Sequence, residues 1–239
     1  MSQNILEVRD VAVYYGGVKA VDGVTFSVKK GQVQGLIGPN GAGKSTVIDA
    51  ITGRRRVNAG QVFLNGKDVT RLGVLERRRL GLARSFQKTS VFAEMTVQDQ
   101  VELAAHMMNP SEAQQNATEV LKQLSLWQMR QDVAKDLGYG EQRRLDLALA
   151  LVGKPSLLLL DEPMAGLSAQ ESEDLASHLV ELVSKWSVSV LLVEHDMDIV
   201  FGISNAVTVF ELGRVIASGQ PQEVRAHPRV REAYLGSAA

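Results

Sequence analysis

Residues 33–52, VQGLIGPNGAGKSTVIDAIT, place a glycine-rich loop directly between a short apolar run and an amphipathic segment. The apolar run VQGLI is typical of a buried strand, and apolar residues at positions 47, 48, 50 and 51 predict a helix that ends near Gly53. Glycines permit backbone angles that other residues avoid and let backbone amides approach a ligand closely. The stretch therefore predicts an α/β fold in which this loop connects a core strand to a helix.

The loop fits the pattern G-x-x-x-x-G-K-[ST] at residues 38–45, which is typical of phosphate binding at a helix N-terminus. Lys44 is expected to reach the β- and γ-phosphates of a nucleoside triphosphate, and the Ser45 hydroxyl to ligate magnesium. A glycine-rich turn with an unrelated lysine is the alternative. The strand predicted before the loop and the helix predicted after it count against this alternative. The residues assigned to nucleotide binding here are Gly38, Pro39, Asn40, Gly41, Ala42, Gly43, Lys44, Ser45 and Thr46.

Apolar runs and helical patterns alternate in the C-terminal half. The runs 156–160, 187–193, 206–210 and 214–219 read as strands, and the segments 168–186 and 197–203, which separate the first three runs, read as helices. This alternation predicts a mainly parallel core sheet with helices on both faces.

Before the loop, the pattern favours an antiparallel β part. LEV, VAVYY and VTFSV are predicted to be three short strands separated by turn residues such as Gly16-Gly17 and Asp22-Gly23. After the loop, QVFLNGKDV at 61–69 is predicted to be a hairpin that turns at Asn65-Gly66. From about residue 97 to 152 the pattern is mostly helical, in the segments 97–108, 111–129 and 141–152. This predicts a helical subdomain at approximately 88–152, inserted in a single domain of residues 1–239. A C-terminal tail is expected at 220–239.

Two further strands end in polar residues that could act on a bound phosphate. Asp161 and Glu162 follow the run LLLL, and His195 follows SVSVLLV after Glu194. Since the carboxyl ends of parallel strands face the ligand crevice, Asp161 is expected to bind magnesium, Glu162 to polarise the attacking water and His195 to contact the γ-phosphate or that water. An acidic turn and a structural histidine are the alternatives.

Composition limits the other classes of function. The 239 residues carry a formal net charge of -1, only 5% are aromatic and none is cysteine, so neither disulfides nor a broad nucleic-acid surface are expected. The basic runs 54–56 and 77–79 are interpreted as solvated surface. With no apolar stretch long enough for a membrane span and no signal-like start, a cytoplasmic location is predicted.

The segment DLGYGEQRRLDLALAL completes a recognisable order of motifs. It resembles the signature of ATP-binding cassette (ABC) proteins, LSGGQ followed by basic residues and a helix, with Leu137, Gly138, Tyr139, Gly140 and Glu141 in the five positions. The resemblance spans nearly the whole chain and implies a phosphate-loop ATPase of the ABC type that uses ATP and Mg²⁺. It also implies that Tyr15 stacks on adenine, although a core aromatic is an equal alternative, and that Gln87 senses magnesium and the attacking water.

The sequence departs from the ABC pattern in the signature and in GLSAQE at 166–171, which resembles the segment after the acidic pair that contacts the partner subunit. Gly138, Tyr139 and Glu141 replace the serine, middle glycine and glutamine, and Ser168 stands where many members carry aspartate. In ABC proteins the signature of one subunit completes the ATP site of another, so the resemblance implies that these differences could weaken hydrolysis at one such shared site. Versions of the signature with tyrosine resemble a known subgroup.

That subgroup comprises the ATPase subunits of uptake systems for branched-chain amino acids and for urea and amides. KAVDGVTF, RSFQKTSVFAEMTV and EVRAHPRVREAYLG are similar to it. The implied partners are membrane-spanning permease subunits, a second ABC ATPase in a heterodimer or homodimer, and indirectly a substrate-binding protein, with no nucleic acid; the implied place is the inner face of the cell membrane. The ATPase of lipopolysaccharide export and a soluble ABC switch are the alternatives.

Overall fold

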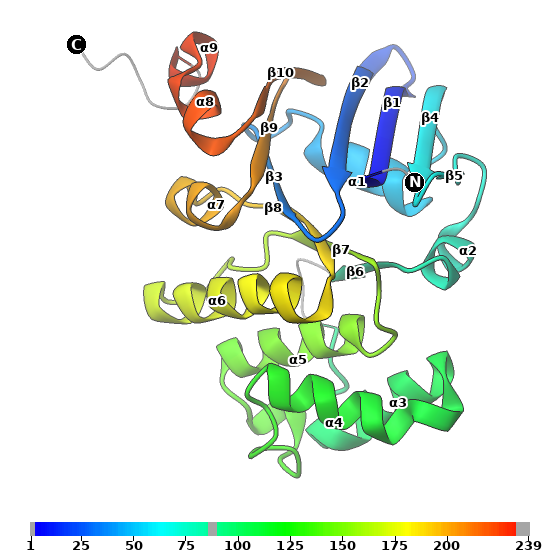
Figure 1. Cartoon of the computed structure of the whole chain (residues 1–239), viewed down its shortest axis with the longest axis vertical. Helices are drawn as coiled ribbons and strands as arrows, with labels where there is room; N and C mark the ends of the chain where they lie inside the picture. The colour runs from blue at the N-terminus through cyan, green and yellow to red at the C-terminus, as the bar shows by residue number, and fades with distance from the viewer. Residues whose placement is uncertain (1–2, 86–89, 233–239) are drawn as a thin grey trace.

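The computed structural model describes residues 3–85 and 90–232 and contains two sheets (Figure 1). The N-terminal sheet is antiparallel, with strands in the order β2-β1-β4-β5. Its strands are β1 (Asn4–Tyr15), β2 (Val18–Lys29), β4 (Ala59–Leu64) and β5 (Lys67–Asp68).

The prediction of three short N-terminal strands is wrong. LEV and VAVYY lie in one strand, β1, because the chain continues through an irregularity at Asp10 instead of turning. Asp10 has a φ of 49° and its amide donates a hydrogen bond to the Thr25 hydroxyl. Asp22 and Gly23 likewise lie inside β2, so VTFSV is only part of that longer strand.

The second sheet has the strand order β10-β9-β3-β8-β7-β6 and is parallel except for β10. Its strands are β3 (Val33–Ile37), β6 (Leu82–Ser85), β7 (Leu157–Asp161), β8 (Ser189–Val193), β9 (Ala206–Glu211) and β10 (Arg214–Gly219). The phosphate-loop strand β3 lies near the middle, between β8 and β9. Of these six strands, β6 has no counterpart in the sequence-based expectations.

The helices cover this sheet on both sides (Figure 1). The α-helices are α1 (Lys44–Thr52), α2 (Val74–Arg79), α3 (Val97–Met108), α4 (Ala113–Gln123), α5 (Tyr139–Leu151), α6 (Ala169–Trp186), α7 (Met197–Ile203), α8 (Pro221–Ala226) and α9 (Pro228–Val230), and short 3₁₀ turns are η1 (Pro110–Glu112) and η2 (Ala134–Asp136). The helices predicted at 97–108, 168–186 and 197–203 are confirmed, with Ser168 as the N-cap of α6 rather than its first residue. The helix predicted at 111–129 is wrong beyond Gln123, where α4 ends, and the one predicted at 141–152 corresponds to α5.

Side chains of β7 and β8 alternate between two hydrophobic clusters. Leu157 and Leu159 pack with α1 and the N-terminal sheet, whereas Leu158 and Leu160 pack with α3 to α6. This alternation is the period-2 geometry of a strand that is buried on both faces. Helices α3 to α5 therefore share one core with the sheet. The predicted division at 88–152 begins at residues that the structure does not describe, and it stays a prediction.

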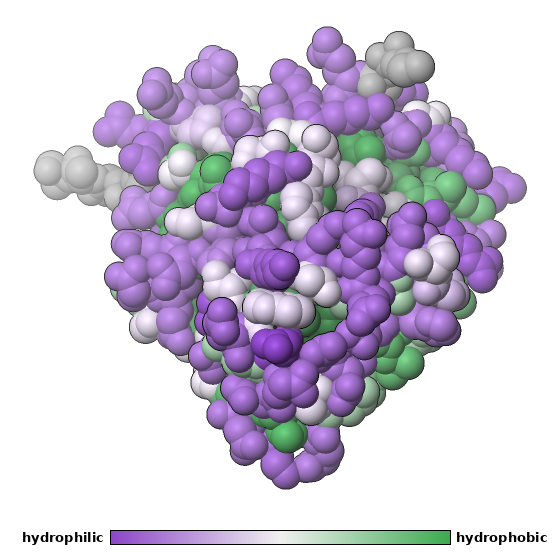
Figure 2. All heavy atoms as spheres, turned by 60° about the horizontal axis from the view of Figure 1, so that its bottom comes forward, coloured by the Kyte–Doolittle hydropathy of each residue, from purple (hydrophilic) through white to green (hydrophobic). Residues whose placement is uncertain are grey.

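The surface gives no sign of a membrane span in the described part of the chain. No helix there is both long and apolar enough to cross a bilayer. The lower face of Figure 1, which comes forward in Figure 2, is mostly hydrophilic, with hydrophobic residues in small patches.

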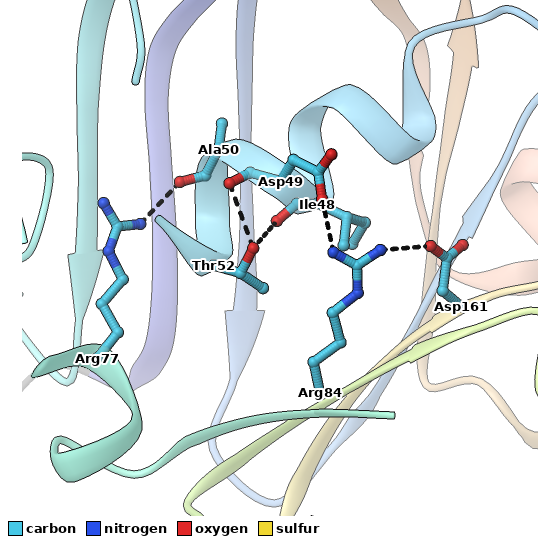
Figure 3. Close-up of polar contacts among 7 residues, drawn as sticks. All are labelled: Ile48, Asp49, Ala50, Thr52, Arg77, Arg84 and Asp161. Atoms are coloured by element: carbon cyan, nitrogen blue, oxygen red, sulfur yellow. Dashed lines mark hydrogen bonds and ion pairs between the residues drawn. The ribbon is translucent and has the colours of Figure 1, made fainter. Parts of the chain in front are cut away.

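One of the two basic runs is not solvated surface as predicted. Arg77 is only 1% exposed, and its guanidinium donates to four backbone carbonyls, including that of Ile51 at the end of α1. Figure 3 shows another of these contacts, with the Ala50 carbonyl. Arg78 also donates to a carbonyl, that of Ala150. Residues 54–56, by contrast, are exposed. Charge composition alone does not predict this burial, because the carbonyl acceptors come together only when the chain folds.

Candidate functional site

The loop between β3 and α1 forms a cradle in which a side chain would not fit. Gly43, with a φ of 101°, precedes α1 and makes no side-chain cap, so no side chain of its own covers the amides at that helix end. A Cβ atom on Gly43 would lie 2.4 Å from the Ala20 carbonyl oxygen, and one on Gly38 would lie 2.7 Å from that of Phe210. Backbone amides at an uncapped helix N-terminus suit a phosphate chain, so the geometry fits the ligand that the motif predicts.

Lys44 lies beneath this loop. It is 7% exposed, and its ammonium group donates hydrogen bonds to the carbonyls of Gly38 and Pro39. Burial lowers the pKa of Lys44, while the carboxylates of Glu162 and Asp161 act in the opposite direction. Lys44 is therefore held between the loop and the acidic pair. Ser45, in the first turn of α1, is exposed.

The acidic pair and the histidine come together at the carboxyl ends of β7 and β8. The Glu162 Oε1 atom lies 2.7 Å from Nε2 of His195. Glu162 has a φ of 52°, and its amide donates to the Val193 carbonyl at 2.8 Å. A positive φ is strained for glutamate, and such strain is held only where the surroundings fix it. Asp161 pairs with Arg84 at 2.8 Å.

Residues 138–141 lie at the N-terminus of α5. The Gly138 amide donates to Oε2 of Glu141 at 2.8 Å, which is the Glu141 half of a capping box, since Gly138 has no side chain to accept a bond in return. The Tyr139 hydroxyl donates to the Ala165 carbonyl at 3.1 Å, so this tyrosine contacts the segment that follows the acidic pair. Among the described residues, no hydrogen bond or ion pair joins residues 138–141 to the phosphate loop.

Comparison with known families assigns the chain. The family described as "ABC transporter" matches residues 21–165, and the family described as "Branched-chain amino acid ATP-binding cassette transporter" matches residues 214–239. The chain belongs to the ABC transporter family.

Relatives of this cassette match over its full length. It is 37% identical to the high-affinity branched-chain amino acid transport ATP-binding protein BraF of Pseudomonas aeruginosa and 36% identical to LivG of Escherichia coli, with 100% of each chain covered in both cases. Among solved structures, it is similar to a nucleotide-free ATP-binding cassette of an ABC transporter (TM-score 0.85, 32% identity, 98% of this chain and 100% of that chain covered). It is also similar to the ADP conformation of an ATP-binding cassette (TM-score 0.86, 32% identity, 99% and 100% covered).

These matches confirm three predictions from the sequence: the ABC family, the α/β cassette fold with its N-terminal antiparallel part, and the ATPase class. The chain is an ATP-binding protein. The roles of individual site residues stay predictions.

Sequence reasoning missed two buried residues that support the cassette's acidic pair. Glu194 is 5% exposed and accepts hydrogen bonds from the amides of Met164 at 2.7 Å and His195 at 3.0 Å. Burial raises the pKa of Glu194, although the two amides lower it. Arg143 on α5 donates to the carbonyls of Glu162 at 2.9 Å and Pro163 at 3.1 Å. The only local signal for Glu194 was a carboxylate directly between a buried strand and His195.

Two of the cassette's predicted ligand residues have different outcomes. Tyr15 is 44% exposed at the end of β1, with the Arg55 guanidinium 4.1 Å from the centre of its ring. The alternative of a core aromatic is therefore wrong, and stacking on adenine stays a prediction. Gln87 lies outside the described residues.

Replacing Gly43 with alanine is expected to reduce the free energy of unfolding by roughly 2 kcal/mol, because the substitution combines a positive φ with a clash against the Ala20 carbonyl. Urea-induced unfolding without nucleotide measures this. The matched control is Gly202→Ala in α7, where the added Cβ meets nothing within 4 Å. Equal stability of the two variants would contradict the cradle geometry.

Proposed function

We propose that this cassette is the ATP-hydrolysing subunit of an importer for branched-chain amino acids or a related polar substrate. The observation that carries this proposal is the full-length match to ATP-binding proteins of branched-chain amino acid transport, together with the match of residues 214–239 to a branched-chain family. The tail match favours this subgroup over the ATPase of lipopolysaccharide export. No feature of the residues that the structure describes favours a soluble ABC switch.

A magnesium ion bound with ATP would neutralise charge on the β- and γ-phosphates. The donor set suits it, since Mg²⁺ prefers oxygen ligands and is often held by one or two carboxylates plus substrate phosphates. We assign the Ser45 hydroxyl and the Asp161 carboxylate to this ion, and Gln87 as a further ligand.

The residues of the site then divide the reaction between them. Lys44 exchanges the Gly38 and Pro39 carbonyls for phosphate oxygens and stabilises the charge of the transferring group. Glu162 orients the attacking water and accepts its proton. His195, in contact with Glu162, holds that carboxylate and the γ-phosphate in register. Tyr15 stacks on adenine.

In this proposal one chain provides half of each site. Residues 138–141 at the N-terminus of α5 close over the ATP that a second cassette holds, so ATP joins the two subunits. Gly138 has no hydroxyl and its amide is bonded to Glu141. The contact with the γ-phosphate therefore depends on the end of α5 and on Gly140.

The surface proposed to contact a permease is a cavity of 410 Å³. It lies where β6 and α2 meet α5, and its lining residues include Leu75, Leu82, Asp146 and Leu149. Motion of the predicted helical subdomain at 88–152 would change the shape of this cavity and so reach a membrane subunit. The cassette would then work at the inner face of the cell membrane.

The test is uptake of radiolabelled leucine, isoleucine and valine by cells that lack the gene for this chain. Uptake is expected to fall and to be restored by the wild-type chain but not by the variant Lys44→Ala. Unchanged uptake of all three amino acids, with a defect in the outer-membrane barrier instead, would favour the export alternative and reject this proposal.

A further inference from the structure

Arg84 links the two chain segments that hold the nucleotide site. Its guanidinium contacts Asp49 Oδ1 through Nη1 at 2.6 Å and Asp161 Oδ2 through Nη2 at 2.8 Å (Figure 3). Asp49 belongs to α1, the helix that begins at the phosphate loop, and Asp161 ends β7. One cation therefore connects the phosphate-loop helix with the strand end assigned to magnesium.

The surroundings keep this cation in place. The side chains of Arg84 and Asp161 are each 12% exposed, whereas that of Asp49 is 36% exposed. Arg84 lies on β6, which pairs in parallel with β7, and it stands opposite Leu159, two residues before Asp161. A buried guanidinium requires carboxylates with good geometry, and the planar fork of arginine fits two of them at once.

We propose that Arg84 is a positioning residue for the metal: an internal counter-ion that holds Asp161 in the metal-free state and weakens the hold of Asp161 on magnesium. This inference rests on the proposed function, which assigns Asp161 to the ion. Oδ2 of Asp161 is bonded to Arg84, so the carboxylate must be shared between the guanidinium and the metal. A positive charge this close to the carboxylate opposes the arrival of a second cation.

The same charge has the opposite effect on a nucleotide without metal. The phosphates of ADP or ATP are negative, and Asp49, Asp161 and Glu162 all lie on the protein side of the site. Arg84 offsets part of that negative charge. Its loss is therefore expected to weaken binding of metal-free nucleotide while it strengthens binding of the metal.

The experiment uses the full chain with ADP and Mn²⁺ as the probe, with bound Mn²⁺ measured by electron paramagnetic resonance and ADP affinity measured separately in EDTA. Arg84→Gln keeps a donor but removes the charge, and Mn²⁺ affinity is expected to rise about fivefold while metal-free ADP binding weakens. Asp49→Asn leaves the full charge of Arg84 to act on Asp161, and Mn²⁺ affinity is expected to fall. The control, Arg9→Gln, removes an equal charge from the exposed Arg9–Glu7 pair of the N-terminal sheet and should change neither quantity.

Opposite shifts in Arg84→Gln and Asp49→Asn support the inference. If Arg84 merely maintained local structure, both variants would disorder Asp161 and both would bind Mn²⁺ more weakly, which overturns it. Affinities within twofold of the wild type in both variants also overturn it and leave the proposed function standing. Absence of Mn²⁺ binding to the wild-type chain with ADP rejects the proposed metal site itself. If Arg84→Gln does not fold, Asp49→Asn still decides, because unchanged or tighter Mn²⁺ binding there contradicts the inference.

Discussion

Replacing Glu162 with glutamine is expected to lower kcat for ATP hydrolysis by about a thousandfold while ATP still binds. The amide has the shape of the carboxylate and can accept a hydrogen bond, but it cannot take a proton from water. The substitution leaves the backbone contacts of residue 162 intact. Its backbone N–H donates to the Val193 carbonyl, and its backbone carbonyl accepts from Arg143. The loss should therefore fall on the chemical step rather than on folding or on nucleotide affinity.

The measurement pairs steady-state phosphate release with binding of a fluorescent ATP analogue. Glu173→Gln, an exposed position on α6, is the control for loss of one carboxylate and should keep the wild-type rate. A kcat within about threefold of the wild type in Glu162→Gln would remove Glu162 from the role of base.

Replacing Arg77 with leucine is expected to reduce the free energy of unfolding by about 4 kcal/mol. The guanidinium donates to the carbonyls of Thr70 and Leu72 as well as to Ala50 and Ile51 at the end of α1. Burial lowers the pKa of Arg77 to about 10, so the side chain stays charged at neutral pH and its charge favours the negative end of α1. Leucine fills much of the volume but leaves these four carbonyls without the donor.

Urea-induced unfolding of the nucleotide-free chain measures this loss. Arg79→Leu, on the exposed side of the same short helix, should change stability by less than about 1 kcal/mol. Arg77→Lys should fall between the two, because one ammonium group cannot reach all four carbonyls. A loss in Arg77→Leu no larger than in Arg79→Leu would show that the carbonyls find other partners.

Much of the candidate site was predictable because its signals are local. The phosphate loop, the acidic pair and His195 each follow a strand that a short apolar run announces, and parallel strands bring their carboxyl ends to one edge. Helix α3 was predicted with the correct bounds, since Thr96 caps its start and Asn109-Pro110 ends it. In such places a few neighbouring residues determine the backbone.

The missed features depend on residues that are far apart in the chain. Arg84 meets its two carboxylates across 35 and 77 positions, and no periodicity announces such a contact. Strand β6, which carries Arg84, is four residues long with Arg and Ser among them, so it gives no apolar signal. Asp10 reads as a turn residue, yet its hydrogen bonds to Thr25 on the neighbouring strand keep β1 continuous. These outcomes are decided by tertiary contacts that override local preference.

The contact of Arg143 with the Glu162 carbonyl has a consequence for a pair of cassettes. In the pair proposed above, the start of α5 would face the nucleotide of the neighbour, while Glu162 would face the nucleotide of its own chain. The Arg143 guanidinium would then couple the two ATP molecules, because a tilt of α5 would move the Glu162 carbonyl and with it the carboxylate proposed as the base. With one such arginine in each chain, each ATP site would influence the other. In a heterodimer whose second cassette lacks this arginine, the coupling between the two ATP sites would act in one direction only.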